Sequence, residues 1–209
     1  MASGEALERE LEARDPDVRL MLQVRADVPG AFEAVVDLYQ NRLMGVLVPM
    51  IGRVEEAEDL TQDVFLRVYR ARKAYRPQAK VATWRFTIAN NLALNHLRGR
   101  NRNPAAGLGV LADDSQALRL EERAPAREGT ASTQLRKVEL SEVVREALEN
   151  LGEDQKMAVL LNKFEEMSYA EIAQVMGRSE AAVKSLLARA RTNLRERLEP
   201  YLQTGRRVP

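Results

Sequence analysis

The sequence predicts an all-α protein made of two small helical domains. Apolar residues recur at three- and four-residue spacing along most of the 209 residues, and no segment alternates between apolar and polar residues as a half-buried strand does. Prolines, glycines and small polar residues interrupt this helical pattern between residues 99 and 132. Hydrophobic residues make up 45% of the chain, which is enough for a core on each side of the interruption. We therefore expect a flexible linker between two helical domains.

Four helical patterns fill the first half of the chain. Asp15 and Pro16 are suited to the first positions of a short helix, and an apolar stripe that starts at Ala31 continues until Pro49 and Gly52 end it. Two further patterns lie at about residues 54–74 and 83–98. Three to four helices of this kind can close into a bundle.

Helical periodicity resumes near Leu135, and helices are expected at about residues 135–151 and 154–165. Ser168 and Glu171 have the spacing of a capping box, which begins the next helix. Gly177 can end that helix in the left-handed conformation, and Ser179 can cap the one that follows. Two helices joined by such a turn form a helix-turn-helix unit.

The expected division of the chain has five parts. These are an amino-terminal extension (1–14), a helical bundle (15–102), a flexible linker (103–134), a helix-turn-helix domain (135–202) and a tail (203–209).

The charge balance and the residue types exclude several classes of function. Lys+Arg number 32 and Asp+Glu 31, so attraction to a polyanion must come from local clusters of cations. The chain has no cysteine and a single histidine, His96, and it shows no phosphate loop, nucleophile motif or metal cluster. We therefore expect no enzyme, cofactor, metal or small-molecule substrate. No apolar stretch could span a bilayer and the acidic amino terminus does not resemble a signal peptide, which predicts a cytoplasmic protein.

The second helix of the helix-turn-helix unit has two different sides. Its inward side is apolar: Val183, Leu187, Ala190, Leu194 and Leu198. The residues expected to meet DNA are Ser179, Ala181, Ala182, Lys184, Ser185, Ala188, Arg189, Arg191, Thr192 and Arg195. This side has small residues and hydroxyl groups, with cations at its edges. Such a surface suits the major groove of DNA, where cations contact phosphates while a few side chains reach base edges. The alternative is a surface helix that is merely solvated, and operator-binding regulators would show the same unit.

A second candidate surface lies on residues 57–75. Leu66 stands among Asp59, Gln62, Asp63 and Arg70 on one side of the expected helix. An apolar anchor inside a polar rim is typical of a protein-binding surface. Isolated exposed leucines are also common, so the pattern alone leaves a simple solvated face open.

Three stretches carry a family resemblance: EDLTQDVFLRVYR, TWRFTIANNLALNHLR and MSYAEIAQVMGRSEAAVKSLLARAR, in this order. Together they resemble the extracytoplasmic-function sigma factors of bacterial RNA polymerase. The resemblance implies a specificity subunit whose first domain, region 2, binds the β′ coiled coil and opens the −10 element. It also implies that the second domain, region 4, binds the β flap and reads the −35 element. Members are commonly held inactive by an anti-sigma factor, so such a partner is expected as well.

The resemblance also implies roles for individual residues. The core-polymerase motif falls on Asp59, Gln62, Asp63 and Phe65, and Leu66 and Arg70 share its helix. The residues implied for the −10 element and its single strand are Thr83, Trp84, Thr87, Asn91, Asn95, Arg98, Arg100 and Arg102. Trp84 could instead pack in the core, and the three arginines could cap the helix dipole as well as touch phosphate.

The chain departs from the family pattern at several positions. Asp63 stands where glutamate is usual and Arg85 where leucine is usual. Val81 and Ala82 offer no aromatic ring, so strand capture is expected to use a loop pocket between residues 76 and 82. The recognition helix departs at Ala182 and Leu186. We expect −35 contacts that differ from the common family sequence.

Two other classes of protein compete with this interpretation. An operator-binding regulator would use the same helix-turn-helix unit without being a polymerase subunit, but it would leave the face of residues 59–70 unexplained. A helical adaptor without a nucleic-acid role is the remaining alternative.

Overall fold

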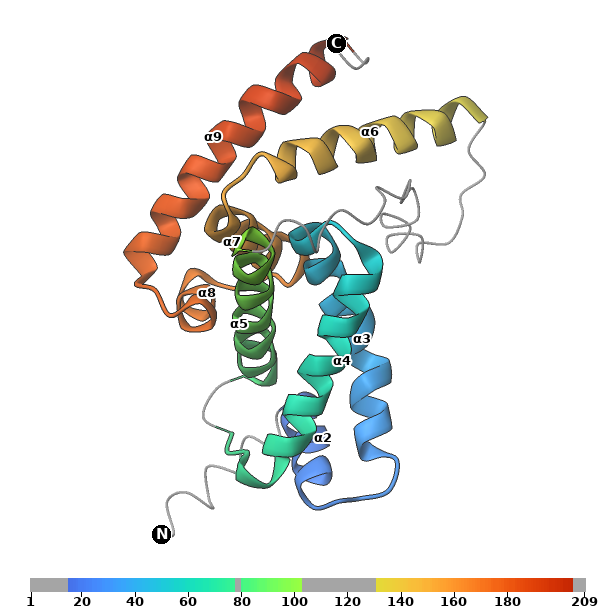
Figure 1. The fold of residues 1–209 in the computed structure, drawn as a ribbon, viewed down its shortest axis with the longest axis vertical. Helices are drawn as coiled ribbons and strands as arrows, with labels where there is room; N and C mark the ends of the chain where they lie inside the picture. The colour runs from blue at the N-terminus through green and yellow to red at the C-terminus, as the bar shows by residue number, and fades with distance from the viewer. Residues whose placement is uncertain (1–14, 78–79, 103–130, 205–209) are drawn as a thin grey trace.

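The computed structural model describes residues 15–77, 80–102 and 131–204 (Figure 1). The elements in these ranges are α2 (Pro16–Arg25), α3 (Ala31–Ile51), α4 (Val54–Ala71), the 3-10 helix η1 (Arg72–Ala74), α5 (Val81–Arg102), α6 (Ala131–Glu149), α7 (Glu153–Phe164), α8 (Tyr169–Met176) and α9 (Glu180–Thr204). No strand occurs in the described ranges, and the predicted all-α fold is confirmed. None of the helices described is both long enough and apolar enough to cross a membrane.

The helices α2 to α5 form the amino-terminal half. The Asp15 carboxylate accepts a hydrogen bond from the Asp17 amide at 2.9 Å, so α2 begins where the sequence predicts. Gly52 adopts φ 84° and ends α3, because glycine takes the left-handed conformation at little cost. Pro49 lies inside the last turn of α3 and does not end the helix. The helix α5 is longer than the predicted 83–98, extending from Val81 to Arg102.

The helices α6 to α9 form the carboxy-terminal half. The Ser168 hydroxyl and the Glu171 carboxylate make the reciprocal bonds of a capping box at the start of α8. Gly177 ends α8 with φ 61°, so the predicted helix-turn-helix unit is present as α8 and α9. The helix α6 begins at Ala131, four residues before the predicted start at Leu135.

Parts of the predicted division lie outside the described residues. These parts are the amino-terminal extension 1–14, linker residues 103–130 and tail residues 205–209, while 131–134 belong to α6 and 203–204 to α9.

The two halves are packed against each other. The helix α7 contacts α3, and α8 lies beside α5 (Figure 1). The buried apolar residues of both halves form one continuous core, from Val18 in α2 to Ala190 in α9. The sequence predicts two bodies joined only by a tether, and it does not predict this shared core.

Candidate functional site

The predicted polymerase-binding residues lie on α4. The polar residues Asp59, Gln62, Asp63 and Arg70 are exposed, and Leu66 between them retains 49% of its accessible surface. This surface therefore has an apolar side chain surrounded by polar groups, as a protein-binding site requires. We call it the α4 face.

Phe65 lies on the other side of α4. Its side chain is buried, and its ring meets that of Phe32 edge to face at a centroid distance of 6.4 Å. Phe65 therefore holds α4 against α3 and is not available to a partner in this structure.

The predicted strand-binding residues of α5 do not all share one environment. Asn91, Asn95 and Arg98 are exposed along one side of the helix, and we call them the α5 strip. Thr83 is buried, and the half-buried Thr87 donates its hydroxyl proton to the Thr83 carbonyl at 2.8 Å. The amides and the guanidinium of the α5 strip are therefore accessible, as groups that bind bases or phosphates must be.

Trp84 stands at the edge of the core. Its ring lies 5.3 Å from the ring of the buried Tyr75, and the indole is half-buried. The structure therefore places Trp84 mainly in packing contacts, one of the two roles that the sequence left open.

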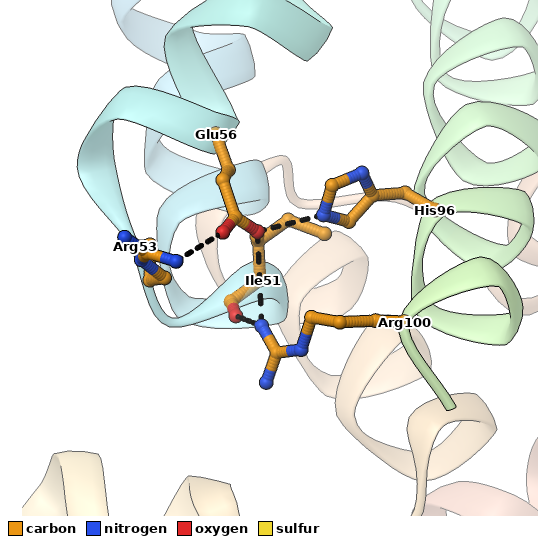
Figure 2. A network of polar contacts seen from close by, with 5 residues as sticks. All are labelled: Ile51, Arg53, Glu56, His96 and Arg100. Atoms are coloured by element: carbon orange, nitrogen blue, oxygen red, sulfur yellow. Dashed lines mark hydrogen bonds and ion pairs between the residues drawn. The ribbon is translucent and has the colours of Figure 1, made fainter. Parts of the chain in front are cut away.

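A charged network ties the start of α4 to the end of α5 (Figure 2). The Glu56 carboxylate accepts hydrogen bonds from Arg53 and from His96 Nε2, both at 2.7 Å. Arg100 lies 3.7 Å from the same carboxylate and donates to the Ile51 carbonyl at 3.2 Å. Burial opposes ionisation of Glu56, but His96 and the arginines outweigh it and hold the pKa of this carboxyl below its usual value.

This network was not predicted from the sequence. Glu56 and His96 are 40 residues apart, and neither stands in a motif that demands the other. Arg98, Arg100 and Arg102, which the resemblance implies for DNA, are all exposed, but Arg100 also contacts the Ile51 carbonyl and the Glu56 carboxylate.

The outer side of α9 is accessible as predicted, and its inner side is packed. Val183, Leu187 and Ala190 are buried, and Leu194 and Leu198 are half-buried. The exposed residues are Ser179, Ala181, Lys184, Ser185, Ala188, Arg189, Arg191, Thr192 and Arg195, while Ala182 is half-buried.

Three side chains of the helix-turn-helix unit make local contacts around α9. The Ser179 hydroxyl accepts a hydrogen bond from the Ala182 amide at 3.2 Å and so caps the helix. Arg191 donates to the Tyr169 hydroxyl at 2.8 Å and thereby fixes α9 against α8. Arg189 folds back on its own helix, with contacts to the Ser185 carbonyl and hydroxyl at 3.4 Å. The Arg189 guanidinium is therefore exposed but held along the surface of its own helix.

Arg85 occupies the core where the family usually has leucine. Its guanidinium lies 3.7 Å from the centre of the Tyr39 ring, and the residue is 2% exposed. Within the described part of the chain none of its three side-chain nitrogens has a hydrogen-bond partner. Burial lowers the pKa of Arg85 to about 10. A cation–π contact with the Tyr39 ring offsets part of the hydration that the Arg85 guanidinium loses on burial.

Comparison with known proteins identifies both halves of the chain. A family model described as Sigma-70 region 2 matches residues 35–103, and one described as Sigma-70, region 4 matches residues 141–194. We therefore call the amino-terminal half the region-2 half and the carboxy-terminal half the region-4 half.

Relatives match along nearly their whole length. The RNA polymerase sigma-H factor of Pseudomonas aeruginosa is 32% identical over 190 residues, which cover 91% of this chain and 97% of the relative. The ECF RNA polymerase sigma-E factor of Haemophilus influenzae is 29% identical over 186 residues, which cover 89% of this chain and 97% of the relative.

A solved structure shares the fold. The sigma factor RpoE of Bartonella quintana, solved in complex with the anti-sigma factor NepR, superposes with a TM-score of 0.61 at 24% identity, over 81% of this chain and 98% of that chain. The family matches, the relatives and the fold agree, and the chain belongs to the extracytoplasmic-function group of the sigma-70 family of RNA polymerase sigma factors.

Proposed function

We propose that this sigma factor engages polymerase and promoter through three separate surfaces. As a sigma factor it binds core RNA polymerase and directs initiation to particular promoters, and the reaction itself belongs to the polymerase. We assign core binding to the α4 face, strand capture at the −10 element to the α5 strip, and −35 reading to the outer side of α9. The chain itself then needs no catalytic group, and it acts in the cytoplasm, where the bacterial polymerase and chromosome lie.

The observation that carries this assignment is the exposure of all three surfaces in one chain that matches both regions. Leu66 gives the α4 face an apolar anchor, and Asn91 and Arg98 give α5 accessible donors. An operator-binding regulator would account for α9 alone, and it would leave the region-2 match without a role.

A regulatory partner follows from the relatives. The Bartonella quintana sigma factor was solved with an anti-sigma factor. We extend that property to this chain and propose that an anti-sigma factor holds it inactive until a signal releases it.

The assignment is tested with the full chain, core polymerase and fragmented genomic DNA. The labelled protein is mixed with core polymerase and the DNA fragments in the presence of heparin. The complexes are captured through the label, and the DNA retained in them is sequenced. We expect retention of a small set of fragments only when protein and core polymerase are both present. Retention by the protein without polymerase, on the same fragments, would favour a regulator that binds operators.

A further inference from the structure

A cluster of polar contacts joins the end of α2 to the 3-10 helix η1. The Asp27 carboxylate accepts a hydrogen bond from Arg72 Nε at 2.8 Å and another from Lys73 Nζ. Lys73 Nζ also donates to the Arg25 carbonyl at 3.0 Å, and the Arg25 guanidinium donates to the Tyr75 carbonyl at 3.2 Å. We call these contacts the Asp27 clamp. They tie the segment that leaves α4 to the turn between α2 and α3.

Asp27 has a backbone conformation that most residues avoid. Its φ is 55°, in the left-handed region, directly after the residue that ends α2. Glycine is the usual residue at such a position, and aspartate adopts the conformation less readily than glycine does. The feature that aspartate adds, and glycine lacks, is a carboxylate directed at two cations.

The clamp differs from an isolated surface ion pair. The Asp27 side chain is 49% exposed, and a single pair at such a position contributes little to stability. Here one carboxylate holds two cations, and Arg72 has further partners in Tyr69, whose carbonyl it contacts at 2.9 Å and whose ring centre lies 3.8 Å from its guanidinium. Hydrogen bonds from Lys73 and then from Arg72 lower the pKa of Asp27, which keeps the carboxylate charged. These combined contacts fix the direction of the chain at η1.

The clamp ends at the residue that packs against Trp84. Tyr75 follows η1 directly and is buried, and its ring centre lies 5.3 Å from that of Trp84 in the first turn of α5. The contact between Glu56 and His96 ties the start of α4 to the end of α5. The Asp27 clamp acts at the opposite end of the same two helices, where α2 contacts η1 (Figure 1). It therefore bears on how α5, with its α5 strip, is placed.

We propose that Asp27 is a positioning residue for strand capture at the −10 element: its carboxylate holds η1 against α2, and this contact fixes Tyr75 and Trp84 where α5 begins. The inference rests on the proposed function, because it takes the α5 strip as the strand-binding surface. Asp27 itself touches neither DNA nor polymerase in this role. Loss of its carboxylate should impair promoter opening and leave core binding at the α4 face unchanged.

The fluorescence of Trp84 tests the structural step in the free full-length chain. Trp84 is the single tryptophan, so the signal belongs to this residue alone. Asp27→Gly removes the carboxylate without straining the left-handed backbone, as Asp27→Ala would. We expect emission at longer wavelength and stronger quenching by acrylamide, because the half-buried indole gains access to water, while circular dichroism shows the same helix content.

Permanganate reactivity of −10 thymines, in complexes with core polymerase, tests the functional step. Asp27→Gly should lower this reactivity about threefold or more, the scale of the one or two exposed ion pairs that are lost. Affinity for core polymerase should stay at the level of the unmodified protein. Asp27→Asn, which keeps an oxygen that can accept from Arg72, should lose less reactivity than Asp27→Gly. The control Asp37→Asn neutralises an exposed carboxylate of α3 outside the clamp and should change neither measurement.

The outcomes separate this inference from the function on which it rests. Unchanged Trp84 emission in Asp27→Gly, or equal losses of thymine reactivity and core affinity, would overturn the positioning role. Normal promoter opening by Asp27→Gly, with promoter-dependent transcripts, would also overturn it and leave the sigma-factor assignment intact. Absence of reactive thymines and of transcripts with the unmodified protein would overturn the assignment itself, and the positioning role with it.

Discussion

The carboxylate of Glu56 accepts a hydrogen bond from His96 Nε2 at 2.7 Å, and this contact joins α4 to α5 (Figure 2). The helix α4 carries the proposed polymerase-binding face, and α5 carries the proposed strand-binding strip. The contact between Glu56 and His96 therefore helps to fix the orientation of the α4 face relative to the α5 strip.

Removal of this carboxylate should loosen α5 and weaken promoter opening. We expect Glu56→Ala to lower the free energy of unfolding by about 1–3 kcal/mol, because His96 and Arg100 lose a half-buried partner. Open-complex formation, measured by permanganate reactivity of promoter thymines, should fall more than affinity for core polymerase. The control is Glu58→Ala, which removes an exposed carboxylate of the same helix. Equal effects of the two variants on both measurements would argue against a positioning role for Glu56.

The α4 face gives a prediction about polymerase affinity. Asp63→Ala or Gln62→Ala should weaken core binding about tenfold, because both side chains border the exposed Leu66. Helicity and the unfolding midpoint should change little, since both positions are exposed. Fluorescence titration of core polymerase checks the affinity, with Glu33→Ala on α3 as the control. An affinity equal to that of the unmodified protein would remove the α4 face from the polymerase contact.

Substitutions in the recognition helix α9 should weaken DNA binding in two different ways. Arg189→Ala should cost about 1–3 kcal/mol at one −35 base pair, as expected for loss of a base contact. Lys184→Ala should weaken binding to all sequences alike and make the logarithmic salt slope shallower by about one unit. Titrations of the full chain with core polymerase on singly substituted −35 duplexes, at several salt concentrations, distinguish the two. If Arg189→Ala weakens binding to every duplex equally, Arg189 does not read a base.

The capping box predicts a response to acid. Hydrogen bonds from Lys80 and Ser168 lower the pKa of Glu171 to about 2, below its usual 4.5. A carboxyl whose pKa is lowered in the folded protein contributes stability above the unfolded value and loses it as the pH falls toward the folded value. This contribution should therefore be complete above about pH 4.5 and decline down to about pH 2.

Glu171→Gln isolates that charge, because glutamine keeps the capping hydrogen bond. We expect the variant to lose about 1 kcal/mol at pH 7 and to show a flatter loss of stability between about pH 5 and pH 2. Urea unfolding followed by circular dichroism measures both quantities, and Glu180→Gln in the first turn of α9 is the control. A pH dependence identical to that of the unmodified protein would show that Glu171 carries no such charge effect.

The features that local chemistry determines were predictable from the sequence. Ser168, Glu171 and Gly177 act through backbone groups within a few residues of themselves, and the helix-turn-helix unit appears where their spacing places it. The same holds for the inward side of α9, where Val183 and Leu187 follow the helical period. The start of α6 was predicted four residues late, because the small polar residues before Leu135 read as linker although a helix can include them.

The features that depend on distant partners were not predictable. The sequence shows only that Arg85 stands where leucine is usual. Its guanidinium packs 3.7 Å from the centre of the Tyr39 ring, which belongs to α3, a helix distant in the sequence. Glu165 reads as a helix-end carboxylate, and its burial against Arg42 arises only when the two halves pack together. Helical periodicity describes each element by itself and contains no information about which distant element will cover it.

Single-round run-off transcription tests the central claim most directly. Core polymerase is given promoter fragments with the unmodified protein, with Asp63→Ala, or with no addition, and the transcript ends are mapped. The account predicts discrete transcripts that require the unmodified protein, begin downstream of shared −10 and −35 sequences, and decrease about tenfold with Asp63→Ala at limiting protein. Transcripts that core polymerase makes equally without the protein, or fragments that the protein binds without any change in initiation, would contradict the assignment as a sigma factor.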